Sequence, residues 1–206
     1  GRYITLAFFV SGLMTKWYID TFCGEEKRYA EDKGVSCFEL LDSMYGREPT
    51  GICITPHIFG SMNPEWDEHR TARLTGLTAA AGKADLYKAV LEGTCCELDL
   101  NLCVLEKMTG PIQKLLMTGG GTNSRNWMQM RADITGKNID AVQNMAEASC
   151  IGAALLAGLG LGMFNSLEDA NRKIRRERVH YFPSDSDRYR KQKAEYLTLH
   201  RPGLLG

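Results

Sequence analysis

The sequence has no excess of charge of either sign. Lysine and arginine number 25, aspartate and glutamate also number 25, and the formal net charge is zero. Proteins that bind nucleic acid usually carry a basic excess, so we expect no nucleic-acid partner. The one basic cluster is "RKIRRER" at residues 172–178. We interpret it as a solvated helix face, because Glu168 and Asp169 precede it.

The sequence also lacks cysteine motifs for a disulfide framework or a metal site. The seven cysteines are odd in number and form no CxxC pair. The four histidines, His57, His69, His180 and His200, pair with no cysteine at ligand spacing. We therefore predict reduced thiols used as small apolar residues, no metal site and a cytoplasmic protein.

No hydrophobic run is long enough for a membrane span. The longest, "CIGAALLAGLGLGMF" at residues 150–164, is short and rich in glycine. No signal peptide is visible at the start of the chain, and we expect no membrane partner. Because the chain begins at Gly1 without a methionine, we expect it to be part of a longer protein.

The residues that are present predict an α/β domain. The chain has 206 residues, of which 44% are hydrophobic, which suits one full-sized domain. Strands alternate with helices along it, as in α/β folds. The predicted helices are residues 3–22, 37–46, 83–107, 123–135, 146–159 and 184–198, with a short one after Ser166. The predicted strands are 51–56, 72–78, 112–118 and 137–142.

The helix at 83–107 has the clearest pattern. Apolar residues such as Tyr87, Leu91 and Cys95 recur at steps of four and three on one face. Lys88 and Glu92 lie off that face.

Three consecutive glycines, Gly119, Gly120 and Gly121, lie between a predicted strand and a predicted helix. A helix start offers free N–H groups and the positive end of its dipole, and glycine lets a ligand approach the main chain. The turn is not a Walker A loop, because no Gly-Lys-Ser/Thr follows, and it is not GxGxxG, because Ser124 stands where the last glycine belongs. A tight turn without a ligand explains the pattern equally well.

The helix at 146–159 is almost without side-chain bulk. Gly152, Ala154 and Gly158 are among its small residues. Such a helix can pack very closely on a sheet or a neighbouring backbone. Glu147 precedes it, where the helix dipole favours a carboxylate.

Several stretches, in order, resemble a known family. They are "FFVSGLMTKW" (8–17), "ARLTGLTAAAGKADLYKAVLE" (72–92), and "GGGTNSRNWMQMRADITGKNI" (119–139) with "EASCIGAALLAGLGLGMF" (147–164). Together they resemble the C-terminal domain of the FGGY carbohydrate kinases. The resemblance implies an actin-like ATPase (ribonuclease H-like) domain with a mixed sheet flanked by helices. It also implies that residues 1–206 are the nucleotide-binding domain, without the N-terminal sugar-binding domain.

The resemblance implies that ATP or ADP binds at the glycine turn. Gly120 matches the backbone contact, while Gly119 and Gly121 shape the turn. Ser124 stands where glycerol kinases use Asn to reach the base, and the neighbouring Asn123 could substitute for it.

Two further positions near the first helix match the family's nucleotide site. Gly12 matches a glycine that lets the nucleotide pass this helix, with helix–helix packing as the alternative. Lys16 replaces a glutamine of glycerol kinases and either meets a phosphate or extends into solvent.

A third stretch matches the family less well. Pro64, Trp66 and Asp67 match a Pro-x-Trp-Asp stretch, but residues 70–72 depart from the Ala-Arg-Gly that usually follows. Trp66 and Asp67 therefore either pin this loop structurally or contribute to a sugar cleft.

No catalytic residue and no metal ligand match the family. Its general base and its Asp-x-Gly-Thr phosphate loop precede the segment with which this chain begins. We expect the Mg²⁺ ligands in that missing N-terminal part, and we expect this chain alone to be inactive.

Three functions stay open at this point. The first is the C-terminal half of a sugar kinase that phosphorylates a ketose or polyol, xylulokinase-like by first choice and autoinducer-2 kinase-like as the alternative. Its partners would be the sugar, its own N-terminal domain and, as an open option, a second copy in a homodimer. The second is a non-catalytic actin-like nucleotide-binding module. The third and weakest is a methyltransferase, for which only Asp140 offers an acidic residue at the second strand.

Overall fold

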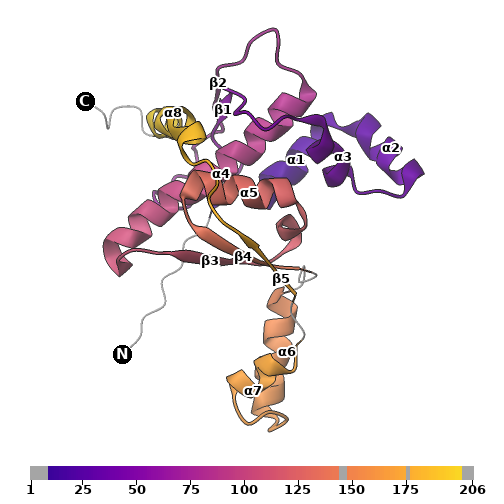
Figure 1. Ribbon diagram of the computed structural model, residues 1–206, viewed down its shortest axis with the longest axis vertical. Helices are drawn as coiled ribbons and strands as arrows, with labels where there is room; N and C mark the ends of the chain where they lie inside the picture. The colour runs from indigo at the N-terminus through magenta and orange to yellow at the C-terminus, as the bar shows by residue number, and fades with distance from the viewer. Residues whose placement is uncertain (1–8, 144–147, 175–176, 201–206) are drawn as a thin grey trace.

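A three-stranded mixed sheet organises the second half of the chain (Figure 1). The computed structural model describes residues 9–143, 148–174 and 177–200. The strands are β3 (Lys114–Met117), β4 (Asn138–Val142) and β5 (Arg178–Tyr181), in the order β3-β4-β5. β3 runs parallel and β5 antiparallel to β4. The α/β class and the mixed sheet are confirmed, whereas β5 was not predicted.

The strand, glycine turn and helix follow one another as predicted. β3 leads into a 3₁₀ turn, η1 (Gly120–Asn123), and then into α5 (Arg125–Thr135). α5 packs on β4 and buries Trp127, Met128 and Ile134. It ends at Gly136, whose N–H donates to the carbonyl of Ala132, which confirms the predicted stop.

The central helix is α4 (Lys83–Thr109), which confirms the helix predicted at 83–107. It contacts α1, α3, α5, α8 and β1, so its neighbours surround it. Gly93 permits the closest of these approaches, because a Cβ there would lie 2.1 Å from the carbonyl oxygen of Ile54 in β1 (Cys53–Ile54).

Because neighbours surround α4, its polar side is buried as well as its apolar face. Lys88 is 2% exposed and Glu92 is 0% exposed. Their charged atoms lie 3.6 Å apart. Glu92 accepts hydrogen bonds from Thr50 Oγ1 and Gln192 Nε2, each at 2.7 Å, while Lys88 donates to the carbonyl of Gly46 at 2.9 Å. Burial raises the pKa of Glu92 and lowers the pKa of Lys88.

Three helices form the first part of the chain. They are α1 (Gly12–Phe22), α2 (Gly24–Lys33) and α3 (Cys37–Met44). The helix predicted at 3–22 begins only at Gly12, since residues 9–11 are not helical and residues 1–8 lie outside the described part. α2 was not predicted, because it is almost entirely polar and buries only Ala30. α3 confirms the helix predicted at 37–46.

Two predicted strands are much shorter than expected. β1 pairs antiparallel with β2 (Leu74–Thr75), and each strand has two residues. The last helix, α8 (Arg190–His200), follows a 3₁₀ turn, η2 (Asp187–Tyr189), and so begins later than the predicted residue 184. Residues 184 and 185 instead donate backbone N–H groups to Asp133 of α5.

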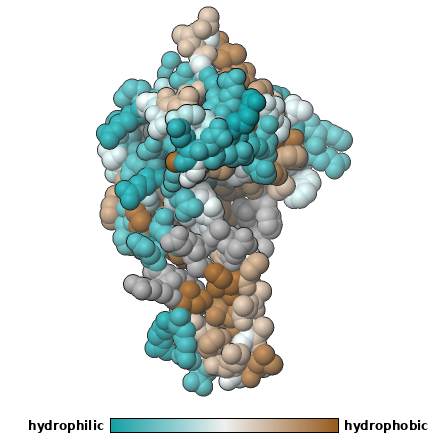
Figure 2. Space-filling view, turned by 90° about the vertical axis from the view of Figure 1, so that its right-hand side faces the viewer, coloured by the Kyte–Doolittle hydropathy of each residue, from teal (hydrophilic) through white to brown (hydrophobic). Residues whose placement is uncertain are grey.

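Helices α6 (Ala148–Gly160) and α7 (Leu167–Arg172) project away from the sheet (Figure 1). Ser166 caps α7 by accepting the N–H of Asp169, which confirms the predicted cap. The close packing predicted for α6 is seen at Gly158, where a Cβ would lie 2.6 Å from the ring of Phe164, but not at Gly152, where a Cβ would meet nothing within 4 Å. Glu147 lies outside the described residues. Apolar side chains gather on this projecting part (Figure 2), with Leu156 60%, Leu161 79% and Met163 67% exposed.

Other expectations from composition have mixed outcomes. None of the seven cysteines forms a disulfide, and the four buried ones, Cys23, Cys53, Cys95 and Cys96, fit the predicted use as small apolar residues, whereas Cys103 and Cys150 are exposed. The basic run is exposed where described, but it is not one helix face, because α7 ends at Arg172 and Arg178 begins β5. Among the described helices, none has the length and apolarity needed to cross a membrane.

Candidate nucleotide site

A cavity of about 470 Å³ lies where α1, α3, η1 and the start of α5 meet. This volume is within the usual range of small-molecule sites, roughly 300–1,000 Å³. Six of the seven residues predicted from the sequence line it: Gly12, Lys16, Gly120, Gly121, Asn123 and Ser124. The seventh, Gly119, is not among the lining residues.

The three glycines of the turn have three different environments. Gly119 has a φ of 98°, a backbone conformation that side chains disfavour. A Cβ at Gly121 would lie 2.9 Å from the ring of Trp127. A Cβ at Gly120 would meet nothing within 4 Å, and its φ is not positive. The fold therefore requires glycine at 119 and 121, whereas at 120 the missing side chain only keeps the cavity open.

Ser124 is tied to the cavity wall by two hydrogen bonds. Its hydroxyl accepts the N–H of Trp127 at 3.1 Å as the N-cap of α5, and it donates to the carboxylate of Asp42 in α3. A hydroxyl has one donor hydrogen and two acceptor lone pairs. Since the hydrogen goes to Asp42, Ser124 offers a ligand one acceptor position.

Asp42 is a wall residue that the sequence did not reveal. Besides Ser124, its carboxylate accepts hydrogen bonds from Tyr45 at 2.9 Å and Tyr87 at 3.4 Å. Burial raises the pKa of Asp42, and the three hydroxyl donors partly offset that rise. Its contact with Ser124 joins residues 82 positions apart, so no local pattern could predict it.

The α1 side of the cavity contains Gly12, Thr15 and Lys16. A Cβ at Gly12 would meet nothing within 4 Å, so the structure gives no support to helix–helix packing as its reason. Thr15 is fully buried, and its hydroxyl has no hydrogen-bond partner among the described residues. A buried hydroxyl without a partner is costly, and a polar ligand in the cavity would relieve that cost.

Lys16 lies at the exposed rim of the cavity. Its side chain is 66% exposed, and its ammonium contacts Asp20 at 2.5 Å. Asp20 also contacts Lys27 at 2.7 Å. Hydrogen bonds from Lys16 and Lys27 lower the pKa of Asp20 to about 2. Lys16 is thus a surface cation that can exchange one anionic partner for another.

Trp127 and Phe38 supply aromatic surface to the cavity. Behind Trp127, the guanidinium of Arg131 stacks 4.1 Å from the ring centroid and donates to Ser11 Oγ at 3.0 Å. Neither aromatic residue was predicted.

No catalytic base or Mg²⁺ ligand is assigned among the described residues of the cavity. Its carboxylates are Glu39 and Asp42, and Asp42 already accepts hydrogen bonds from Ser124 and two tyrosines. Asp133 does not line this cavity, and its carboxylate accepts the backbone N–H groups of residues 184 and 185.

Of Trp66 and Asp67, the two residues considered as structural pins of the Pro-x-Trp-Asp loop, only Asp67 holds the loop. Asp67 pairs with Ser61 through two backbone hydrogen bonds of 2.8 and 2.9 Å, and its side chain accepts the N–H of His69. Trp66 is 74% exposed, so it does not pin the loop.

Comparison with known proteins places these features in one family. The FGGY family of carbohydrate kinases, C-terminal domain, matches residues 4–161. An autoinducer-2 kinase from Salmonella paratyphi B (strain ATCC BAA-1250 / SPB7) is 32% identical over 179 residues, covering 84% of this chain and 33% of that protein. The chain thus spans about a third of the length of this curated relative.

Solved structures agree on the fold. A xylulose kinase from Rhodospirillum rubrum aligns over 93% of this chain and 38% of its own, with a TM-score of 0.69 and 23% identity. A Plasmodium falciparum glycerol kinase with ADP aligns over 92% of this chain and 36% of its own, with a TM-score of 0.68 and 24% identity. Both confirm the actin-like ATPase fold. The chain belongs to the FGGY family of carbohydrate kinases and contains the family's C-terminal domain.

Proposed function

We propose that this chain is the nucleotide-binding part of an ATP-dependent sugar kinase and that ATP or ADP binds in the cavity beside η1. The observation that carries the proposal is Gly120, which lines the cavity although neither its φ nor any neighbouring atom requires glycine. A bare backbone facing an open cavity suits a ligand that lies against the main chain. The glycerol kinase of similar fold, whose structure contains ADP, supports the same ligand class.

The lining residues suit different parts of a nucleotide. The aromatic surfaces of Trp127 and Phe38 suit an adenine ring, and the free acceptor position on Ser124 suits its exocyclic amine. At the rim, the exposed ammonium of Lys16 suits a phosphate, for which it would leave Asp20. The buried hydroxyl of Thr15 is an unused donor between these ends. Gly119 and Asn123 complete the proposed site as the turn residue and as an exposed polar side chain.

The remaining machinery would come from an N-terminal domain of the same protein. This domain would supply the general base, the phosphate loop and the ligands for Mg²⁺, which would neutralise phosphate charge. Two observations support such a partner: the chain spans about a third of its relatives' length, and Leu156, Leu161 and Met163 leave an exposed apolar surface on α6 and its following turn. A homodimer covering that surface is the alternative.

The substrate is proposed as a ketose or polyol, with xylulose as the first candidate. Xylulose kinases from Rhodospirillum rubrum and Lactobacillus acidophilus share the fold. The autoinducer-2 precursor is the second candidate, because the autoinducer-2 kinases are more similar in sequence, at 29–32% identity. Most sugar contacts would lie in the proposed N-terminal domain, so the assay must decide between the two candidates.

A coupled assay of ADP release tests the proposal. The 206-residue chain and the longer protein with its N-terminal domain are compared on xylulose, glycerol, gluconate and the autoinducer-2 precursor. We expect sugar-dependent turnover from the longer protein only. Turnover by the 206-residue chain would show that a catalytic base has been overlooked. Nucleotide binding without turnover on any sugar in either protein would favour a non-catalytic module.

A further inference from the structure

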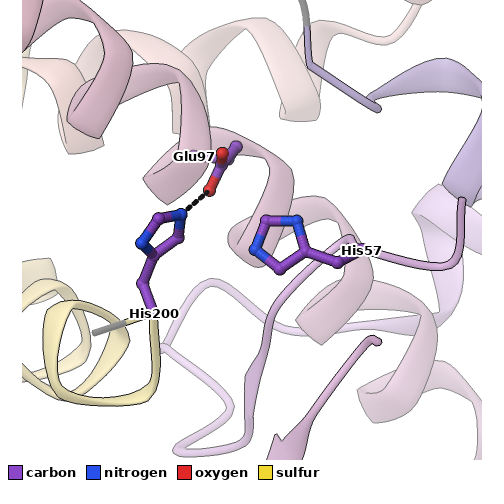
Figure 3. A group of neighbouring side chains, drawn as sticks. All are labelled: His57, Glu97 and His200. Atoms are coloured by element: carbon purple, nitrogen blue, oxygen red, sulfur yellow. Dashed lines mark ion pairs between the residues drawn. The ribbon is translucent and has the colours of Figure 1, made fainter. Parts of the chain in front are cut away.

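A second cluster of functional side chains lies in the core, away from the cavity described above. It contains His57 from the segment after β1, Glu97 from α4 and His200 from the end of α8 (Figure 3). None of the three lines the proposed nucleotide cavity. One ligand atom from each residue lies within 4.8 Å of the other two, and all three side chains are buried.

The histidines of this cluster have unused ring nitrogens. Nε2 of His57 and Nδ1 of His200 are buried and have no hydrogen-bond partner among the described residues. His57 is 4% exposed and His200 is 2% exposed. Figure 3 shows the two rings and the carboxylate converging on a common space. In His200 it is Nε2, and not the unpartnered Nδ1, that faces Glu97. A buried polar nitrogen without a partner is costly, so the nitrogen whose missing partner a ligand in this space could supply is Nε2 of His57.

The carboxylate of Glu97 is already oriented toward this space. The hydroxyl of Tyr196 donates to Oε2 of Glu97, and the amide of Asn101 lies 3.5 Å from Oε1. Nε2 of His200 lies 3.6 Å from Oε2. Hydrogen bonds of this kind are what hold a metal-binding carboxylate in place.

The charged groups around the cluster carry a net negative charge. Two positive groups act on the cluster: Arg70, whose Nη1 lies 3.5 Å from Nε2 of His200, and Arg73, whose charge adds to the effect of burial in lowering the pKa of His57. Arg70 also contacts Glu65 at 3.3 Å and Asp67 at 3.5 Å. With neutral imidazoles, these two carboxylates, Glu97 and the two guanidiniums sum to a charge of minus one, which favours a cation. Arg70 would then shift toward Glu65 and Asp67.

A route from solvent to the cluster exists. A cavity of about 420 Å³ is lined by His57, Arg70 and the exposed pair Glu68 and His69. It gives an ion access to the side of the cluster on which His57 lies.

We propose that His57, Glu97 and His200 bind one transition-metal ion of the Zn²⁺ class, in a structural site that ties α8 to α4 and to the segment after β1. Two imidazoles and one carboxylate are a common donor set for this ion, with a water completing the coordination. Ligand bonds of about 2 Å in tetrahedral geometry separate the donor atoms by about 3.3 Å. The 3.6 Å between His200 and Glu97 is close to this, so His57 makes the larger adjustment.

This proposal departs from the expectation that the chain has no metal site. That expectation considered histidine and cysteine spacing along the sequence, whereas the three ligands come from distant segments. It is also independent of the proposed kinase function, since it needs neither nucleotide nor sugar.

Zinc titration of the metal-free 206-residue chain tests the proposal, with a chromophoric chelator as competitor. Exposed thiols also bind zinc, so all proteins carry Cys103→Ser and Cys150→Ser. We expect one Zn²⁺ per chain, a rise in Tm with Zn²⁺, and the visible absorption of a tetrahedral Co²⁺ site on cobalt substitution. Glu97→Gln preserves side-chain shape and should weaken zinc binding by about 100-fold or more, a loss at least as large as removal of an outer-shell partner causes. His57→Gln and His200→Gln should act in the same direction.

The two remaining histidines are the matched controls. His69→Gln and His180→Gln remove side chains that are 90% and 54% exposed, and they should leave zinc affinity unchanged. Loss of binding in His69→Gln but not in Glu97→Gln would move the metal to the exposed Glu68–His69 pair and overturn the proposal. Absence of stoichiometric binding in the parent protein, with no Zn²⁺-dependent rise in Tm, would also overturn it.

Discussion

Replacement of Gly93 by alanine should destabilise the protein, although alanine is the better helix former. In an open helix interior the change from glycine to alanine stabilises by about 0.8–1.0 kcal/mol. At Gly93, however, the new Cβ would lie 2.1 Å from the carbonyl oxygen of Ile54 and 3.1 Å from its carbonyl carbon. Those atoms are backbone in β1, and Ile54 is only 6% exposed, so α4 and β1 must separate to relieve the clash. Overpacking of this kind costs about 1–3 kcal/mol or more.

Because a 2.1 Å approach to backbone is severe, we place the overpacking cost at the upper end, about 3 kcal/mol. Less the helix gain of about 1 kcal/mol, this leaves an expected net loss of about 2 kcal/mol in the free energy of unfolding of Gly93→Ala, measured by urea denaturation. Gly152→Ala is the matched control, because a Cβ there meets nothing within 4 Å. This control should slow amide hydrogen exchange in α6, whereas Gly93→Ala should speed it in α4. If Gly93→Ala stabilised α4 as Gly152→Ala stabilises α6, the close packing of α4 on β1 would be refuted.

Two further substitutions test the polar interior. Glu92→Ala leaves the buried ammonium of Lys88 without its carboxylate, and urea denaturation should show a loss of about 3–5 kcal/mol; a loss below about 1 kcal/mol would mean that the pair contributes little. Asp42→Asn tests the pH dependence of stability. Burial raises the pKa of Asp42 above 3.8, so the folded protein binds the proton of this carboxyl more tightly than the unfolded chain does. The contribution of Asp42 to stability therefore falls as the pH rises above 3.8. As the pH increases above 3.8, the free energy of unfolding of the wild type should decline relative to that of Asp42→Asn. If the two free energies changed in parallel with pH, the burial assigned to Asp42 would be contradicted.

Local signals were enough to predict the elements that carry the candidate site. The terminal glycine of α5 acts within a few residues, and the apolar repeat of α4 reflects the packing of one face. The capping role of Ser124 was not predicted, because the helix was expected from residue 123 and begins at Arg125. The same repeat could not show that α8 covers the other side through Gln192 and Glu92, 100 residues apart. β5 was missed because its alternating Val179 and Tyr181 span only four residues next to a basic run.

Side chains that meet across the fold were beyond the reach of sequence patterns. Asp42 and Ser124 come from α3 and the start of α5, and only the packing of these helices around the cavity joins them. The glycine turn, by contrast, was predictable, because three consecutive glycines between a strand and a helix are themselves the local signal for a turn. The sequence could not show which of the three glycines the fold requires, because this depends on the backbone φ at each position and on the atoms that surround it.

The most direct test of the central claim is whether ADP binds at Gly120. Amide NMR shifts of the 206-residue chain are followed at millimolar ADP, because one wall of the phosphate site is expected in another domain and binding should be weak. We predict shifts concentrated in residues 119–124 and α1, and their loss in Gly120→Val. Gly24→Val is the control, since Gly24 also has no atom within 4 Å of a Cβ and does not line the cavity. No shifts, or shifts that persist in a folded Gly120→Val protein, would contradict the nucleotide site.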